Sequence, residues 1–333
     1  MTSYVIRRLV WLVVVAVGMT LVTFVVTHLI PADPAKFAAG LDATADQIER
    51  VKRDLGLDRP LPEQYLIYVG NLARGDLGTS IITKRPVADD LHDYFPATLE
   101  LALFTILAIV LVGVPLGVLS ATRRGGLVDL LTRLLATLWV AIPVFWFGLL
   151  LQLLFYLKLG WLPAGERLDP GITLPRLSGL MAVDAVLQGD ARALASALKH
   201  LVLPVLALSL TRVAVVARMA RASMLEVLGG DYIRTARAKG LPEWIVVYRH
   251  ALKNAALPVL TTLGTQIGFL LGGAILVEAI FQWPGMGRYA VSSITSVDFP
   301  AVMGVTLLAS AVFVLVNLVV DLLYVVIDPR ISY

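Results

Sequence analysis

Cysteine is absent from the 333 residues of this chain, and histidine occurs only four times. The absence of cysteine excludes disulfide bonds, thiolate catalysis and cysteine metal sites. The four histidines form neither an HExxH nor an HxH pattern, so the sequence predicts no metal site. The chain also lacks a Walker A sequence and a recognisable nucleophile–base pair. We therefore expect no catalytic residue and no cofactor bound by this chain.

Charged residues are scarce as well, at 16% of the sequence, whereas about a quarter is usual in soluble proteins. The hydrophobic fraction is 58% and the mean hydropathy is +0.82, which together indicate an integral membrane protein. The isoelectric point of 9.3 reflects a net excess of only four positive charges, and the basic residues lie beside apolar segments rather than in one patch. We interpret the basic charge as a signal of membrane topology and not of nucleic-acid binding.

Six apolar runs are long enough to cross a hydrocarbon core of about 30 Å. They cover residues 9–30, 98–121, 130–157, 201–222, 259–281 and 301–327. With six crossings, every short connection rich in lysine and arginine falls on one side, so both chain ends are expected to be cytoplasmic. The sequence thus predicts an all-α integral membrane fold with six transmembrane helices. Pro115 and Pro143 are expected to kink the second and third helices.

The first apolar run, with Arg7 and Arg8 before it, also resembles a signal peptide. The run is longer than the apolar region of a signal peptide, and no small-residue cleavage site follows it. We therefore interpret residues 1–31 as an uncleaved N-terminal transmembrane helix.

Two longer polar segments are expected on the outer side of the membrane. Residues 32–97 form the first, in which Thr44 and Gln47 predict a helix capping box. Residues 158–200 form the second, which is rich in proline and glycine up to Gly179 and then predicts an amphipathic helix through Leu198. Residues 98–333 are expected to be a five-helix core that includes this second outer segment and an inner loop at residues 223–258.

The most unusual polar stretch is residues 231–258, between the fourth and fifth apolar runs. Five lysine and arginine residues outnumber two acidic residues there, which indicates a cytoplasmic location. Helix-forming residues stop at Gly240, and Pro242 suits the first turn of a second helix, so the stretch predicts two short helices joined by a tight turn. Tyr232 and Ile233 are interpreted as packing residues. A projecting polar unit of this kind predicts a cytoplasmic partner.

The sequence YIRTARAKGL at residues 232–241, followed by His250, Asn254 and Pro258, resembles the EAA loop of binding-protein-dependent ABC importer permeases. It resembles the variant of the peptide and nickel branch, with Arg-Thr-Ala at residues 234–236 where the general motif has Glu-Ala-Ala. The sequences GDLGTS at 75–80, AIPVFWFG at 141–148 and GGAILVEAIFQWPGMGR at 272–288 extend the resemblance to the B-type permeases of this branch over nearly the whole chain.

The resemblance implies a type I importer permease in a prokaryotic cytoplasmic membrane. Its implied partners are a second homologous permease, two cytoplasmic ATPase subunits that bind ATP and Mg²⁺, and an extracytoplasmic solute-binding protein. The implied cargo is a dipeptide or oligopeptide, with glutathione and nickel chelates as alternatives. The implied ATPase-coupling residues are Arg234, Thr235, Ala236, Arg237, Ala238, Lys239, Gly240, Leu241, His250, Asn254 and Pro258.

Within this loop, the bases before Gly240 are expected to face the ATPase, and Pro258 is expected to set the angle of the fifth helix. His250 and Asn254 lie four residues apart on a predicted helix. We interpret this pair as holding the shape of the loop rather than binding a metal.

Polar residues within the apolar runs are candidate contacts of a translocation path: Arg212, Gln266, Glu278 and Asp321. Arg212 lies near mid-membrane if the fourth helix begins at residue 201, and snorkels to the inner surface if the helix begins earlier. Both interpretations stay open. For Glu278, Asp321 and Glu100, capping and interhelical hydrogen bonding are favoured over recognition of a peptide amino terminus or proton coupling.

Two other classes of function are also compatible with the sequence. A self-contained channel or secondary carrier would transport its solute without any separate ATPase. A membrane anchor or scaffold would have no transport role and no polar cavity between its helices.

Overall fold

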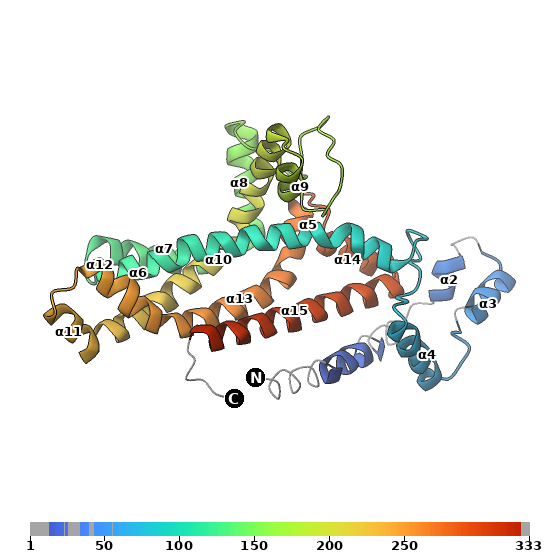
Figure 1. The fold of residues 1–333 in the computed structure, drawn as a ribbon. Helices are drawn as coiled ribbons and strands as arrows, with labels where there is room; N and C mark the ends of the chain where they lie inside the picture. The colour runs from blue at the N-terminus through green and yellow to red at the C-terminus, as the bar shows by residue number, and fades with distance from the viewer. Residues whose placement is uncertain (1–12, 23, 26–33, 40–42, 55, 328–333) are drawn as a thin grey trace. The chain divides into compact units, whose positions relative to one another are not determined.

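The computed structural model describes the chain apart from residues 1–12, 23, 26–33, 40–42, 55 and 328–333 (Figure 1). Its described residues form helices and connections, and their β-type pairing is limited to an isolated bridge between Thr79 and Pro86. The expected all-α fold class is therefore confirmed for this part of the chain. The chain divides into two compact units, Met1–Pro96 with Gly285–Leu315 and Ala97–Pro284 with Val316–Tyr333.

The first unit shows that residues 32–97 have structure of their own. It contains the helix Val13–Val22, α2 (Pro34–Ala39), α3 (Ala45–Asp54), α4 (Leu61–Ala73), α14 (Met286–Thr295) and the first parts of α5 (Val87–Ala108) and α15 (Phe299–Ile327). The predicted capping box begins α3, because the N–H of Thr44 donates to Gln47 Oε1 at 2.8 Å and the N–H of Gln47 donates to Thr44 Oγ1 at 3.4 Å. Helix α5 begins well before the expected start at residue 98.

A small core joins α5, α14 and α15 in this first unit. Its buried residues are Val87, Leu91, Met286, Tyr289 and Ala301. The carboxylate of Asp298 accepts hydrogen bonds from Ser80 Oγ at 2.5 Å and from the N–H of Ile82 at 3.2 Å. The turn-rich segment before α5 is therefore fixed to the start of α15.

The second unit is organised around α10 (Ala191–Leu228), a helix of 38 residues. It packs against α6 (Val114–Thr122), α7 (Leu127–Ala141), α8 (Val144–Leu151), α9 (Met181–Leu187) and α13 (Leu252–Ile280). The Asp190 carboxylate caps α10 by accepting from the N–H of Ala193 at 2.9 Å. The prediction of one amphipathic helix through Leu198 was wrong, because the chain turns at Gly189 with φ +68° and separates α9 from α10.

Helices α6 and α10 approach each other at backbone distance. A Cβ added at Gly117 would lie 2.5 Å from both the Ala217 carbonyl oxygen and the Ala220 Cβ. A Cβ added at Gly113, one helical turn earlier, would lie 3.3 Å from the Val213 carbonyl oxygen. This small-xxx-small pattern is a common way for membrane helices to pack closely.

The two prolines expected to kink helices act differently. Pro115 lies in the first turn of α6, directly after the π-helix η1 (Ile109–Gly113), and the helical path continues from Val87 to Thr122. A π-turn widens the helix where a proline removes a backbone donor. Pro143 instead separates α7 from α8, and the two parts of the third expected helix meet at an angle of 102°.

Three helices of the described chain are long and apolar enough to cross a membrane: Val87–Thr122, Ala191–Leu228 and Phe299–Val320. A fourth is added if the bent pair Leu127–Ala141 and Val144–Lys158 is one span. Helix α13 covers the fifth expected run, and much of the first run lies outside the described residues. The chain thus has apolar helices suited to a multi-pass membrane protein, while the count of six stays a prediction.

Candidate functional site

Loop 231–258 has the helix–turn–helix form that the sequence predicts. Helix α11 (Asp231–Ala238) ends at Lys239, and Gly240 turns the chain with φ +74° while its N–H donates to the Arg237 carbonyl at 2.9 Å. A positive φ of this size favours glycine. Pro242 caps the short helix α12 (Glu243–Ile245), where the missing N–H of proline removes no helical hydrogen bond.

The underside of the loop is a closed hydrophobic core. From the loop, Ile233, Ala236, Val246, Val247 and Ala251 pack against Val118 and Ala121 of α6 and against Met224 of α10. The side chain of Ile233 is completely buried, as predicted, whereas Tyr232 is 47% exposed, so its assignment as a packing residue was wrong. The core binds the loop to two membrane helices at once.

The opposite face of the loop is exposed and carries aromatic side chains that sequence reasoning missed. Trp244 is 67% exposed, Tyr248 is 54% exposed and Tyr232 is 47% exposed. Of the eleven coupling residues inferred from the resemblance, Arg234, Thr235, Arg237, Ala238, Lys239 and Gly240 are exposed, as are Asn254 and Pro258. Ala236 is buried, and Leu241 and His250 are partly buried. Exposed aromatic and arginine side chains are the types enriched at protein interfaces.

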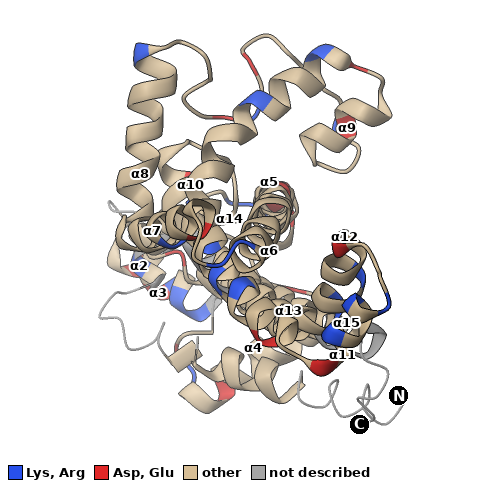
Figure 2. Cartoon of the chain, turned by 90° about the vertical axis from the view of Figure 1, so that its left-hand side faces the viewer, with Lys and Arg blue, Asp and Glu red and all other residues tan. Residues whose placement is uncertain are grey.

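Part of the basic charge of the loop is neutralised within the loop itself. The Arg237 guanidinium donates two hydrogen bonds to the Glu243 carboxylate, at 2.6 and 3.1 Å, and closes the turn at Gly240. This pairing raises the pKa of Arg237 and lowers the pKa of Glu243. Arg234 Nη1 lies 3.2 Å from Asp231 Oδ1 and forms a second ion pair. Figure 2 accordingly shows both charge signs on α11 and α12.

The second helix of the loop continues directly into the expected fifth span. Helix α12 is followed without interruption by the π-helix η3 (Val246–Ala251) and by α13. Asn254 Nδ2 donates to the His250 carbonyl at 2.8 Å, and the structure shows no His/Cys/Asp/Glu group that could hold a metal in the residues it describes. Pro258 lies inside α13, six residues after its first residue, and its expected effect on the angle of the fifth helix stays a prediction.

Arg212 is buried in the middle of α10, with 8% of its surface exposed. Its Nη1 donates to the Leu208 carbonyl at 2.7 Å, one turn toward the start of the helix. Helix α10 begins at Ala191, before residue 201, and an earlier start was the condition under which Arg212 would snorkel to the inner surface. The hydrogen bond to Leu208 directs the side chain toward the start of the helix. Arg212 is therefore a buried charge among packed helices, and its place in a translocation path stays a prediction.

Replacement of Arg212 by methionine is expected to lower solute uptake by roughly tenfold, equivalent to about 1.4 kcal/mol, if this buried charge faces the path. Methionine keeps much of the side-chain volume but removes the charge and the donor to the Leu208 carbonyl. Arg212→Lys retains the charge and serves as the matched control in the same uptake assay. Normal uptake by folded Arg212→Met protein would remove Arg212 from the candidate path.

The other candidate path residues lie in different surroundings. Glu278 is fully buried and accepts a hydrogen bond from Thr98 Oγ1 at 2.6 Å. Gln266 is partly buried on α13, and the side chain of Asp321 lies outside the described residues. The contact of Glu278 with Thr98 agrees with the favoured interpretation of interhelical hydrogen bonding.

Glu100 forms a buried ion pair that joins the second outer segment to α5. Arg167 Nη2 lies 2.5 Å from Glu100 Oε2, and the other carboxylate oxygen accepts from the N–H of Ala182 at 2.8 Å. The guanidinium also lies 5.7 Å from the ring centroid of Trp283, which is fully buried. The structure thus supports the structural role predicted for Glu100, and its partner Arg167 could not be identified from the sequence.

Residues of the same outer segment line a partly open cavity of about 560 Å³, whose walls are part polar and part apolar. Residues that line it include Gln152, Trp161, Glu166, Asp169, Lys199 and His200. Gln152 Nε2 donates to the carbonyls of Ala164 and Ile280, at 2.7 and 3.0 Å, and so fixes the cavity wall.

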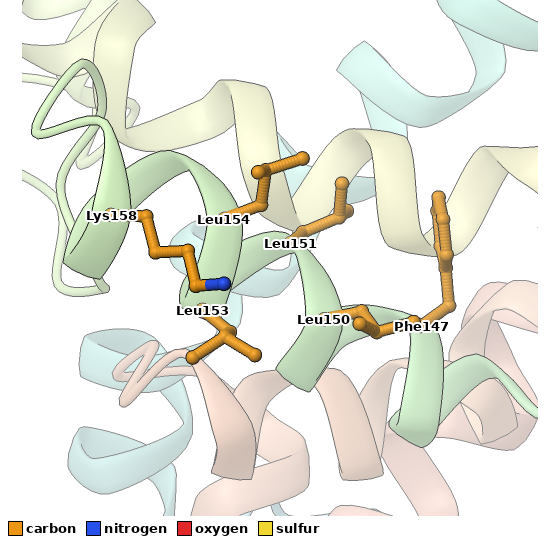
Figure 3. Close-up of a pocket in the computed structure, with 6 residues that line it drawn as sticks. All are labelled: Phe147, Leu150, Leu151, Leu153, Leu154 and Lys158. Atoms are coloured by element: carbon orange, nitrogen blue, oxygen red, sulfur yellow. The ribbon is translucent and has the colours of Figure 1, made fainter.

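A second depression, on α8 and the following π-helix η2 (Gln152–Lys158), is almost entirely apolar. It measures about 270 Å³ and is lined by Phe147, Leu150, Leu151, Leu153, Leu154 and Lys158 (Figure 3). The long Lys158 side chain lies alongside the leucines (Figure 3). Such a lining suits hydrocarbon and not a polar solute.

Two protein-family descriptions match the chain. Residues 113–333 match the inner membrane component of binding-protein-dependent transport systems. Residues 1–102 match the N-terminal part of the membrane component of these systems. The two matches together cover nearly the whole sequence.

Curated relatives match over their full lengths. The chain is 49% identical to the probable D,D-dipeptide transport system permease protein DdpB of Escherichia coli strain K12, over 98% of this chain and 97% of the relative. It is 45% identical to the dipeptide transport system permease protein DppB of Alkalihalophilus pseudofirmus, over 100% of both chains. It is 41% identical to the glutathione transport system permease protein GsiC of Pectobacterium atrosepticum, again over 100% of both.

These matches confirm the resemblance to peptide ABC importer permeases that the motifs indicated. They also confirm the expectation of a transport subunit rather than an enzyme, because the matched relatives are permease components. The chain belongs to the family of binding-protein-dependent transport system inner membrane components.

Proposed function

We propose that this chain forms half of the translocation pathway of an ATP-driven importer of dipeptides or short oligopeptides. The cargo is inferred from the dipeptide permeases among its relatives. Glutathione is the alternative that a specific observation supports, because a glutathione permease is 41% identical over the full length. A nickel chelate is the third cargo class compatible with the motifs.

The proposed assembly contains a second homologous permease, two ATPase subunits with ATP and Mg²⁺, and an extracytoplasmic solute-binding protein. This chain contributes six membrane-spanning helices, with both ends in the cytoplasm of a prokaryotic cell. Transport against a gradient requires an energy source, and the absence of a Walker A sequence means that the energy comes from a partner.

The observation that carries the proposal is the two-sided construction of loop 231–258. Its underside is buried against α6 and α10, while Gly240, Tyr232 and Trp244 are exposed. An ATPase that moves this exposed side would move the buried side as one body. Because α12, η3 and α13 form one helical path, the displacement reaches the fifth span without a flexible joint.

The proposal is tested by reconstitution of this chain with and without its ATPase subunits. We expect dipeptide uptake into proteoliposomes only when the second permease, the ATPases, ATP and the binding protein are all present. Uptake by this chain alone would instead identify a self-contained carrier or channel. Mass spectrometry of the ligand that copurifies with the binding protein would then distinguish peptide, glutathione and metal chelate.

A further inference from the structure

A groove of about 380 Å³ lies between α7 and the later turns of α10, away from the residues assigned to coupling or transport. Three arginines line it, Arg133 from α7 and Arg218 and Arg221 from α10. The rest of its lining includes Leu130, Leu134 and Ala217. The groove therefore combines a basic part with an apolar part in one continuous surface between two membrane helices.

The arginines of the groove carry more charge than the neighbouring carboxylate neutralises. Asp129 is buried and accepts from Arg221 Nε at 2.6 Å and from Arg221 Nη2 at 3.0 Å. Arg133 Nε lies 3.6 Å from the same carboxylate. In the part of the chain that the structure describes, no carboxylate lies within ion-pair distance of Arg218. Three guanidinium groups and one carboxylate leave an excess of two positive charges.

The groove lies close to one end of the membrane helices. Gly117 of α6 faces Ala217 and the backbone N–H of Arg221, and α6 ends five residues later at Thr122. At 1.5 Å per residue, the groove is about 7.5 Å from the end of that helix. Arg123 and Arg124 follow directly in the turn. This distance keeps the arginines within reach of lipid headgroups. Along α7, Leu130 lies between the turn and Arg133, whereas Leu134 lies one residue beyond Arg133, toward the middle of the helix.

We propose that this groove binds one anionic phospholipid, with its phosphate held by Arg133 and Arg218 and its acyl chains along α7. A guanidinium presents paired donors that match two phosphate oxygens. Basic pockets between membrane helices on the cytoplasmic side are recognised sites for anionic headgroups. A soluble anion would use only the basic part of the groove, whereas the acyl chains of a phospholipid also cover Leu134 and Ala136.

The test is native mass spectrometry of the full-length chain, purified in mild detergent with the subunits that accompany it. The probes are phosphatidylglycerol and phosphatidylcholine with the same acyl chains. We expect selective retention of one phosphatidylglycerol, and a loss of roughly fivefold or more in its apparent affinity in Arg133→Gln/Arg218→Gln, or about 1 kcal/mol. Arg218→Gln alone, at an exposed position, provides a milder variant should the double variant fold poorly.

Arg123→Gln/Arg124→Gln is the matched control, because it removes two nearby positive charges outside the groove. It should retain phosphatidylglycerol. Equal retention of both lipids by the unmodified protein, unchanged retention by folded groove variants, or an equal loss in the control would overturn the proposal. The variant Leu134→Cys, whose cysteine is the only one in this chain, adds a second readout. Efficient cross-linking of that cysteine to another subunit would show that protein, not lipid, covers the groove.

Discussion

Uptake coupled to ATP hydrolysis is expected to fall by roughly tenfold or more when Gly240 is replaced by proline. A loss of about 1.4 kcal/mol in the binding of loop 231–258 to the ATPase already corresponds to a factor of ten. Gly240 has φ +74°, whereas a proline ring fixes φ at about −65°. Proline also removes the N–H that donates to the Arg237 carbonyl. The turn must therefore reopen, and α11 must move relative to α12. Peptide uptake and solute-stimulated ATPase activity of the reconstituted complex measure the effect.

Two further substitutions at Gly240 separate the effect of backbone conformation on coupling from the effect of side-chain volume. An added Cβ at Gly240 meets no heavy atom within 4 Å, so volume alone costs little. Asparagine visits the left-handed region readily, and Gly240→Asn should therefore retain most of the coupling. Alanine pays about 1–2 kcal/mol there and should be intermediate. Normal coupled uptake by the proline variant, or an equal loss in all three variants, would contradict a role for this turn.

The coupling defect is expected without unfolding, because Gly240 is not part of the core beneath the loop. Ile233, Val246 and Ala251 hold the loop to α6 and α10 through buried contacts that do not include Gly240, and Leu241 alone of the turn packs against them. Size-exclusion chromatography and copurification of the ATPase would show whether the variant assembles. Loss of ATPase stimulation in an assembled complex is the expected outcome.

The turn itself could be predicted from the sequence, whereas the contact face of the loop could not. Helix-forming residues followed by Gly240 and Pro242 specify a local stop and restart, which depends on neighbouring residues only. The burial of Ile233 and the exposure of Tyr232 depend on α6 and α10, which come from distant parts of the sequence. For the same reason, the exposure of Trp244 was missed: an aromatic residue in an apolar stretch is as compatible with a core as with an interface.

Hydropathy located the apolar helices but not their ends or breaks. Helix α10 extends to Ala191 because Asp190 caps it, a signal that an apolar-run search passes over. Pro115 and Pro143 look alike in sequence, yet one follows a π-turn in a continuous helix and the other separates two helices at 102°. The difference arises from packing: Gly113 and Gly117 hold the first helix against α10. Polar partners such as Arg167 and Glu100, 67 residues apart, are equally invisible to local patterns.

Replacement of Arg167 by methionine is expected to destabilise the second unit by about 3–5 kcal/mol, because it leaves the Glu100 charge buried without its ionic partner. The two side chains are only 9% and 2% exposed, so water does not replace the lost contact. Arg167 Nη2 also donates to the Gly179 carbonyl at 2.7 Å, and this acceptor loses its donor as well. A lower midpoint of thermal unfolding and faster hydrogen exchange across the outer segment would report the change.

The double variant Glu100→Gln/Arg167→Met tests whether the buried charge is the cause. It removes both charges, while glutamine keeps an oxygen to accept from the N–H of Ala182. We expect the double variant to be more stable than Arg167→Met alone, because no uncompensated charge is left in the interior. Arg192→Met, at an exposed position in the first turn of α10, is the matched control and should unfold like the unmodified protein. If Arg167→Met matched that control, or if the double variant lost at least as much stability as the single one, the ion pair would not be what holds the outer segment to α5.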